Sequence, residues 1–193
     1  MKLVAAGLTG LTIISLGVIG IAAASSTPGL DSSVVATLVF PANASITGGG
    51  SPAGHGTNSI EIYSWSWGVS QSSAATGIGG VVRTGRESVH DLVITKSTDQ
   101  STPALWRACA SGKHYGVVYI YLDEPTSANP GAAAGYSPYM TITLKNAYIA
   151  SDTLDGTVGS SESPKETITF AFAHSTMTWT EGGKTAIDAW QSR

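Results

Sequence analysis

In the C-terminal half of this 193-residue chain, apolar and polar side chains alternate with a period of two. One run covers residues 140–148 (MTITLKNAY), where methionine, isoleucine and leucine alternate with threonine and lysine, and a second covers residues 167–172 (TITFAF). Successive side chains of a β-strand point to opposite faces of a sheet, so each run predicts a half-buried strand. The segment Val117–Leu122 is apolar at nearly every position, which is typical of a strand covered on both faces. The pattern predicts an all-β body.

The segment Ile60–Gln71 (IEIYSWSWGVSQ) extends this pattern with two tryptophans. Read as one strand, it places Ile60 and Ile62 on one face; the other face carries Tyr63, Trp65, Trp67 and Val69. Because tryptophan buries a large area, we expect Trp65 and Trp67 in the core, in preference to an aromatic ligand platform.

Two further strands and four loops complete the predicted body. The strands are expected at Val34–Phe40 and Ser88–Lys96, and Trp179 is expected to end the last core strand. Glycine, serine and proline predict loops at Asn43–Asn58, Ser72–Gly80, Asp123–Pro138 and Ser151–Pro164. The first loop is expected to be flexible. The polar ending EGGKTAIDAWQSR is expected either to fray or to add an edge strand.

One short helix interrupts the strands. Ser101-Thr102-Pro103 supplies a candidate N-cap followed by proline at the first helical position, and Gly112 supplies a left-handed stop. Trp106 on this helix would either cover the core or contact a neighbouring subunit. Cys109 shares the apolar face with Leu105 and Ala108, which favours a small buried side chain over a nucleophile.

The first 26 residues differ from the rest. Lys2 precedes an apolar stretch that ends in Ala22-Ala23-Ala24, the small residues that a signal peptidase reads before Ser25. The sequence therefore predicts a signal peptide at 1–26 and a single domain at 27–193, with an uncleaved membrane anchor as the alternative. The expected location is secreted or extracellular, and periplasmic or membrane-anchored if the leader is retained.

Composition excludes several classes of protein. Charged residues make up 12% of the chain and the net charge is −3, so no basic excess is available to neutralise phosphates, and we expect no nucleic-acid binding. The single cysteine excludes an intrachain disulfide.

The residues that could perform chemistry are scattered along the chain. They are His55, His90, His114, His174 and Cys109. No nucleophile elbow, zinc-protease, paired-cysteine or phosphate-loop motif is present, so we predict no catalytic, cofactor-binding or metal site. A remaining alternative is an exported monomeric β-domain that binds a glycan or surface partner through Tyr136, Tyr139 and the loops.

Several blocks, in this order and spacing, resemble one known family. They are IEIYSWSWGVSQ, SVHDLVITKSTDQSTPALWRACASGKHYGVVYIYL, YMTITLKNAYIASDT, ESPKETITFAF and the terminal GGKT. Over Val34 to Lys184 the chain is similar to the haemolysin-coregulated protein (Hcp) family, the tube subunits of type VI secretion systems. The resemblance implies a compact two-sheet β-barrel with one helix and no enzymatic activity. It also implies homohexameric rings that stack into a hollow tube, with a spike protein, a sheath and small effector cargo as partners.

The resemblance also assigns roles to particular segments. It implies that the Pro41–Ser59 loop reaches the adjacent ring, and the ordering entropy of its glycines Gly48–Gly50 makes us expect weaker stacking than ring formation. Polar faces such as Thr141, Thr143 and Lys145 would line the lumen. The apparent signal peptide departs from the family, whose tube subunits are ordinarily loaded from the cytoplasm without a leader.

Overall fold

The computed structural model of the protein describes residues 34–56, 58–75, 82–126, 135–159, 161–182 and 184–191. All of them belong to one compact unit, Ser32–Arg193. The predicted leader at 1–26 lies outside the described residues. Within the described part of the chain, no helix is both long and apolar enough to cross a membrane.

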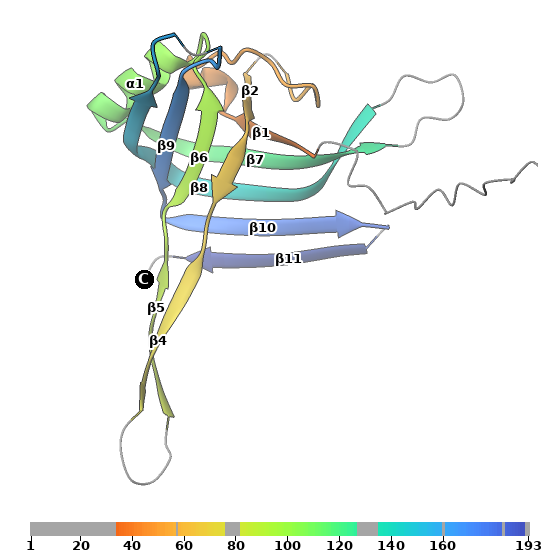
Figure 1. Ribbon diagram of the computed structural model, residues 1–193. Coiled ribbons are helices and arrows are strands. Elements are labelled where there is room, and N and C mark those ends of the chain that lie inside the picture. Colours follow the sequence, from red (N-terminus) through yellow and green to blue (C-terminus); the bar gives the residue numbers. More distant parts are fainter. Residues whose placement is uncertain are drawn as a thin grey trace, which may run out of the picture. The chain divides into compact units, whose positions relative to one another are not determined.

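Strands dominate this unit, and one α-helix accompanies them (Figure 1). The strands are β1 (Val35–Val39), β2 (Ser59–Ile62), β3 (Ser64–Ser66), β4 (Val69–Ala75), β5 (Val82–Val89), β6 (Leu92–Ser97), β7 (His114–Thr126), β8 (Gly135–Asp155), β9 (Lys165–Ala171), β10 (His174–Glu181) and β11 (Lys184–Gln191). The helices are the 3-10 turn η1 (Ala42–Ala44) and α1 (Thr102–Ser111). The prediction of a β fold with one short helix is confirmed.

A nine-stranded antiparallel sheet forms the body, in the order β2-β1-β7-β8-β9-β6-β3, with β10 and β11 branching from β8. Its first and last strands, β2 and β3, are separated by Tyr63 alone, whose backbone N–H donates to Thr95 O of β6 at 2.8 Å. One segment of chain therefore pairs with β1 at its start and with β6 at its end, so the sheet curls around a common interior. The strands β4 and β5 form a separate two-stranded sheet.

The interior of the curled sheet is an apolar core. Alternate residues of β1, β2, β6, β8 and β9 contribute fully buried side chains, among them Leu38, Ile60, Ile94, Ile142, Leu144 and Phe170. Helix α1 adds Leu105 and Ala108. Because about 25 cal/mol of stabilisation accompanies each Å² of apolar surface removed from water, this cluster is the main source of stability in a chain without a disulfide.

The long strand β8 changes partner along its length. It pairs with β10 up to Lys145 and with β9 from Tyr148 onward. Between them Asn146 adopts φ 50°, a left-handed conformation that residues with a Cβ rarely take. Its side-chain oxygen lies 3.0 Å from His114 Nδ1 on β7. This local reversal lets β8 bend from one set of neighbours to the other.

The prediction of a single strand at Ile60–Gln71 is wrong, because the segment divides into β2, β3 and the start of β4. Ile60 and Ile62, which the pattern places on the same face, are both buried. Trp65 and Trp67 pack against the core cluster, as expected, but they are only partly buried.

The predicted strand Ser88–Lys96 is interrupted at His90 and Asp91. His90 N donates to Gly68 O at 2.9 Å, which fixes the point where the chain leaves β3 for the β4–β5 hairpin and returns to β6. The predicted loop Ser72–Gly80 starts too early, since β4 continues to Ala75.

Two other predicted loops are shorter than expected. Strand β7 runs to Thr126 and β8 begins at Gly135, so every described residue of the predicted loop Asp123–Pro138 belongs to one of these two paired strands. Strand β8 also continues to Asp155, into the predicted loop Ser151–Pro164. Glycine, serine and proline can occur near the ends of paired strands. For this reason their presence in the sequence suggested loops where the strands in fact continue. The polar C-terminal segment was expected either to fray or to add an edge strand. It forms the edge strand β11.

The helix ends are where the sequence places them. Gly112 adopts φ 60° and its N–H donates to the last turn, and proline lies in the first turn. Ser101, however, makes no side-chain cap; its N–H and hydroxyl both donate to Asp99 Oδ1. Trp106 is 50% exposed, so the prediction that it covers the core is wrong.

Candidate functional site

The structure does not bring the candidate catalytic residues together. His90 contacts Ser70 Oγ at 3.0 Å, His114 contacts Asn146, and His174 lies opposite Lys145 in the β8–β10 ladder. His55 pairs with Asp123 at 2.8 Å. Among the described residues, no group of three or more histidine, cysteine, aspartate or glutamate side chains could hold a metal ion.

Cys109 lies on α1, as predicted, and is half-buried where full burial was expected. Burial raises the pKa of its thiol, and the nearby Asp152 raises it further. A nucleophilic cysteine needs the opposite shift, because the thiolate is the reactive form. The thiol therefore acts as a packing residue.

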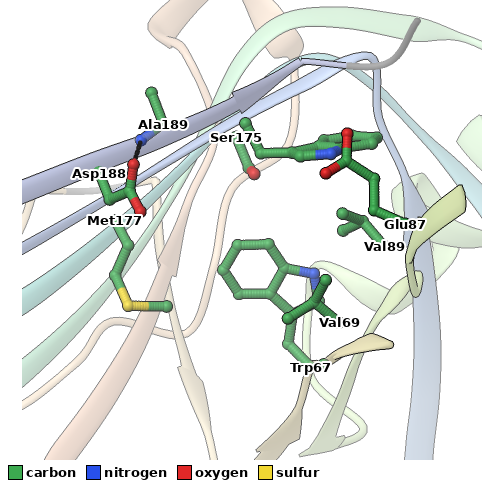
Figure 2. A pocket seen from close by; sticks show the side chains of 10 residues that line it. Trp67, Val69, Glu87, Val89, Ser175, Met177, Asp188 and Ala189 are labelled. Carbon is green, nitrogen blue, oxygen red and sulfur yellow. Dashed lines mark hydrogen bonds between the residues drawn. The ribbon is translucent and has the colours of Figure 1, made fainter. Parts of the chain in front are cut away.

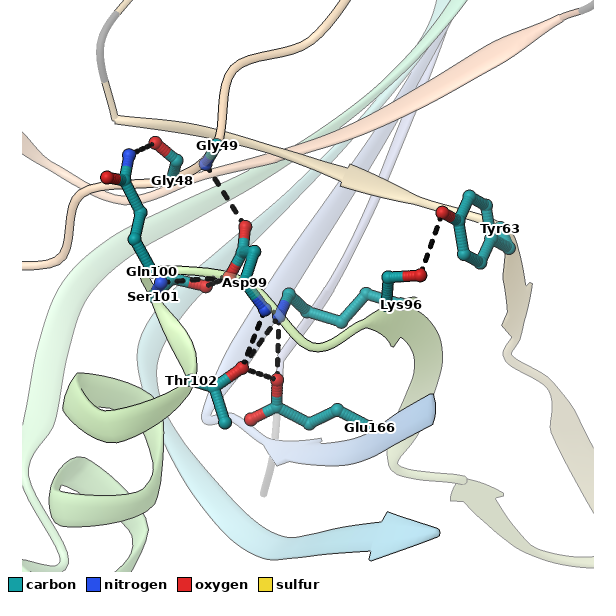
Figure 3. Close-up of polar contacts among 10 residues, drawn as sticks. Gly48, Gly49, Tyr63, Lys96, Asp99, Gln100, Ser101, Thr102 and Glu166 are labelled. Carbon is teal, nitrogen blue, oxygen red and sulfur yellow. Dashed lines mark hydrogen bonds and ion pairs between the residues drawn. The ribbon is translucent and has the colours of Figure 1, made fainter. Parts of the chain in front are cut away.

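A buried polar cluster joins α1 to the sheet (Figure 3). Lys96 Nζ donates to Glu166 Oε2 at 2.6 Å, to Asp99 Oδ1 at 2.9 Å and to Thr102 Oγ1 at 3.2 Å. Burial would raise the pKa of Asp99, but hydrogen bonds from Ser101 and Lys96 outweigh burial and lower it. No sequence pattern indicates this cluster, because Lys96 and Glu166 are 70 residues apart and each occurs in an ordinary alternating strand.

The same cluster contains a second carboxyl group with unusual protonation. Burial, followed by the neighbouring charge of Glu166, raises the pKa of Asp152 to about 7. The cluster is enclosed within the fold and bordered by no described pocket, so we assign it a structural role.

The loop between β1 and β2 is held against its own subunit. Ala44 and Ile46 are buried, Gly49 N donates to Asp99 Oδ2 at 3.1 Å, and the His55 ring stacks on Tyr121 with centroids 4.1 Å apart. The Gln100 side-chain amide also donates to the carbonyl oxygen of Gly48. The expectation of a flexible loop is therefore wrong for its described residues.

Two parts of the structure leave strand edges unpaired. Within the described residues, β11 pairs with β10 alone, and β4 and β5 pair only with each other. Large apolar side chains are exposed beside these edges: Ile187 on β11 is 66% exposed and Val69 on β4 is 70% exposed. Exposed edges carry free backbone donors and acceptors and are ready to pair with another chain.

A groove lies between the root of the β4–β5 hairpin and the β10–β11 hairpin (Figure 2). It has a volume of about 530 Å³. Its lining combines apolar side chains with two carboxylates and comprises Trp67, Gly68, Val69, Glu87, Val89, Ser175, Met177, Asp188, Ala189 and Trp190. Figure 2 shows the Trp67 ring projecting toward the strands that carry Ser175 and Met177. We call it the acidic aromatic groove.

The predicted lumen residues share one face of β8. Thr141, Thr143 and Lys145 alternate with the fully buried Ile142 and Leu144, so they point away from the core. Tyr136 and Tyr139, which the glycan-binding alternative places at loops, instead belong to β8, and Tyr139 packs against the core.

Comparison with known proteins places the chain in a family. Residues 40–179 match the family model described as "Type VI secretion system effector, Hcp". The chain is 36% identical to Protein hcp1 of Pseudomonas aeruginosa over 85 residues, which is 44% of this chain. The matched region spans about half of that relative, 48% of its length.

Solved structures share the fold. A type VI secretion system effector from Yersinia pestis has a TM-score of 0.59 at 20% identity, over 81% of this chain and 98% of that one. Hcp1 from Salmonella typhimurium has a TM-score of 0.59 at 20% identity, over 82% and 95%. A structure described as a type six secretion system protein reaches 0.63 at 18% identity, over 82% and 96%. The predicted resemblance is confirmed: the chain belongs to the Hcp family of type VI secretion, a family of secreted structural proteins and not of enzymes.

Proposed function

We propose that the chain is a ring subunit: six copies close into a homohexameric ring, and rings stack into a hollow tube that carries small effectors out of the cell. A spike protein and a sheath would be its partners in that machine. Membership of the Hcp family carries this proposal. The six-fold number and the partners come from the family resemblance.

The unpaired strand edges support ring formation. A closed ring needs two unlike surfaces on each copy, related by a fixed rotation. The free edge of β11 and the β4–β5 hairpin together offer one such surface, and exposed Ile187 and Val69 give it an apolar contribution. The outward face of β8 with Thr141, Thr143 and Lys145 offers small polar side chains suited to an unselective lumen.

The held loop at 41–56 supports stacking. We expected the glycines to weaken stacking by their ordering entropy, but Gly48 and Gly49 are already fixed by Gln100 and Asp99 in the single subunit. The conformational entropy of the loop is then lost when the subunit folds, and not when two rings come into contact. A preordered loop favours contact with an adjacent ring.

Sedimentation velocity and negative-stain images of the purified full chain test the proposal. We expect a species of about six times the mass of one chain, seen as rings, and tubes at higher concentration. A chain that stays monomeric at every concentration up to the millimolar range would overturn it. That result would favour the alternative of a monomeric β-domain.

A further inference from the structure

The acidic aromatic groove is built on fixed aromatic rings. Phe172 packs edge-on against Trp67, with centroids 5.9 Å apart, and against Trp190, with centroids 6.2 Å apart. Trp67 Nε1 donates to His90 O at 3.0 Å, which holds that indole in place. Trp190 Nε1 is buried and has no hydrogen-bond partner among the described residues. The packed rings make the groove a preformed surface.

Among the described residues that line this groove, the charged ones, Glu87 and Asp188, are both acidic. One oxygen of Asp188 accepts from Ala189 N at 2.8 Å, and the Asp188 carboxylate borders the groove. An apolar groove with a carboxylate at its border suits an occupant that presents a large apolar side chain next to a cation. Tryptophan and arginine are the residues that most often dominate protein interfaces in this way.

Helix α1 presents such a pair on this chain's own surface. Successive helix residues are separated by about 100°, so the buried Leu105 and Ala108 direct Trp106 and Arg107 to either side of the outward direction. Trp106 is 50% exposed and Arg107 is exposed. Arg107 forms no ion pair with any described residue.

The helix and the groove are different surfaces of one copy. Helix α1 packs against β8, whereas β10, β11 and the root of β4–β5 border the groove. The α1 sequence TPALWRACAS contains no acidic residue, and the exposed Lys113 follows it, so the charges of the two surfaces are complementary.

We propose that, in the assembled ring, the acidic aromatic groove of one copy receives Trp106 and Arg107 from helix α1 of the neighbouring copy. The indole packs against Trp67 and Met177, and the guanidinium pairs with Asp188. A cation beside aromatic rings and a carboxylate in a partly desolvated groove interacts more strongly than an exposed one. The inference rests on the proposed ring and identifies a contact that closes it.

Charge reversal and its repair test the contact in the full chain. Arg107→Glu and Asp188→Lys should each raise the concentration of half-assembly at least tenfold in sedimentation velocity, and the double variant should return it to within about threefold of wild type. Lys165→Glu is the matched control, since Lys165 is 56% exposed on β9 and does not line the groove. Its assembly should be unchanged.

The apolar half of the contact has its own control pair. Trp106→Ala should weaken assembly at least tenfold with an unchanged thermal midpoint, whereas Leu154→Ala, at a side chain that is 44% exposed, should not. Assembly that is unaffected by Trp106→Ala would overturn the inference.

Disulfide trapping between copies gives a direct readout. In a Cys109→Ser background, chains carrying Arg107→Cys are mixed with chains carrying Asp188→Cys and oxidised. We expect heterodimers in which each copy contributes one thiol. If all variants form rings but no crosslink appears, the proposed contact is wrong and the ring proposal stands. The same holds if another protein is found to fill the groove. A wild-type chain that never forms rings would overturn the ring proposal and this contact with it.

Discussion

The Lys96 ammonium lies 2.6 Å from the Glu166 carboxylate, and neither side chain is more than 1% exposed. This pair joins β6 to β9 next to the start of α1, and Thr102 Oγ1 donates to the same carboxylate oxygen at 2.6 Å. Among the described residues, Lys96 is the only cation of the cluster, which also contains Asp99 and Asp152. Its charge keeps three carboxyl groups together within a small volume.

Lys96→Met should therefore destabilise the fold by about 3–5 kcal/mol, because Glu166 would remain buried without its partner. Urea unfolding measures the loss. The exposed pair Lys165–Glu162, at 3.4 Å, supplies the control: Lys165→Met should cost no more than about 1 kcal/mol. Equal effects of the two substitutions would contradict the structural role of the cluster.

The raised pKa of Asp152 predicts a pH dependence of stability. With the folded pKa at about 7 and the ordinary value at 3.8, the folded state binds the proton more tightly. This contribution to stability is fully present below the ordinary value and is lost as pH rises through about 7. From about pH 5 to pH 8 the loss should be on the order of 1–2 kcal/mol, after discounting for partial exposure. Urea titrations across this range should show a flatter profile for Asp152→Asn, and an unchanged slope would contradict the assignment.

Because Asn146 is left-handed, we expect glycine to be tolerated better than valine at this strand position, the reverse of the usual strand preference. Asn146→Val, although valine favours strands elsewhere, should cost about 1–2 kcal/mol because a β-branched residue is strained at φ 50°. Asn146→Gly should cost less than about 1 kcal/mol, which mainly reflects the lost contact with His114. Thermal unfolding compares the two variants, and a more stable valine variant would sink the argument.

For the leader we predict cleavage after Ala24. The apolar stretch ends in small residues and no basic cluster follows it. Intact-mass analysis of protein from the native host should find a chain that begins at Ser25. Replacing Ala22 and Ala24 by phenylalanine should retain the leader, and an uncut wild-type chain would instead support the membrane anchor.

Periodicity and end signals predicted the parts of the fold that depend on local chemistry. The alternation at 140–148 and 167–172 identified β8 and β9, and Pro103 with Gly112 bracketed α1 correctly. The same reasoning failed at Ile60–Gln71, since the positions at which a strand changes partners depend on remote strands. Tyr63 ends β2 because its N–H bonds to β6, which local sequence does not encode.

The surfaces relevant to function were harder to predict. The sequence was compatible with Trp106 as a core residue or as a contact residue. The structure shows that Leu105 and Ala108 are the buried residues of the helix and that Trp106 is exposed. The groove could not be predicted at all, because its lining comes from four strands and the connection between β3 and β4. The family resemblance predicted the fold but not this hollow.

The β4–β5 hairpin leaves and rejoins the sheet between two strands that already pair with each other. Ser66 at the end of β3 lies opposite Val93 in β6, and Ala75 opposite Val82 is the last described pair of the hairpin. Extra residues inserted between Ala75 and Val82 would leave every ladder of the larger sheet unchanged. The hairpin tip is therefore a position where a peptide tag could be inserted without altering the pairing of the larger sheet.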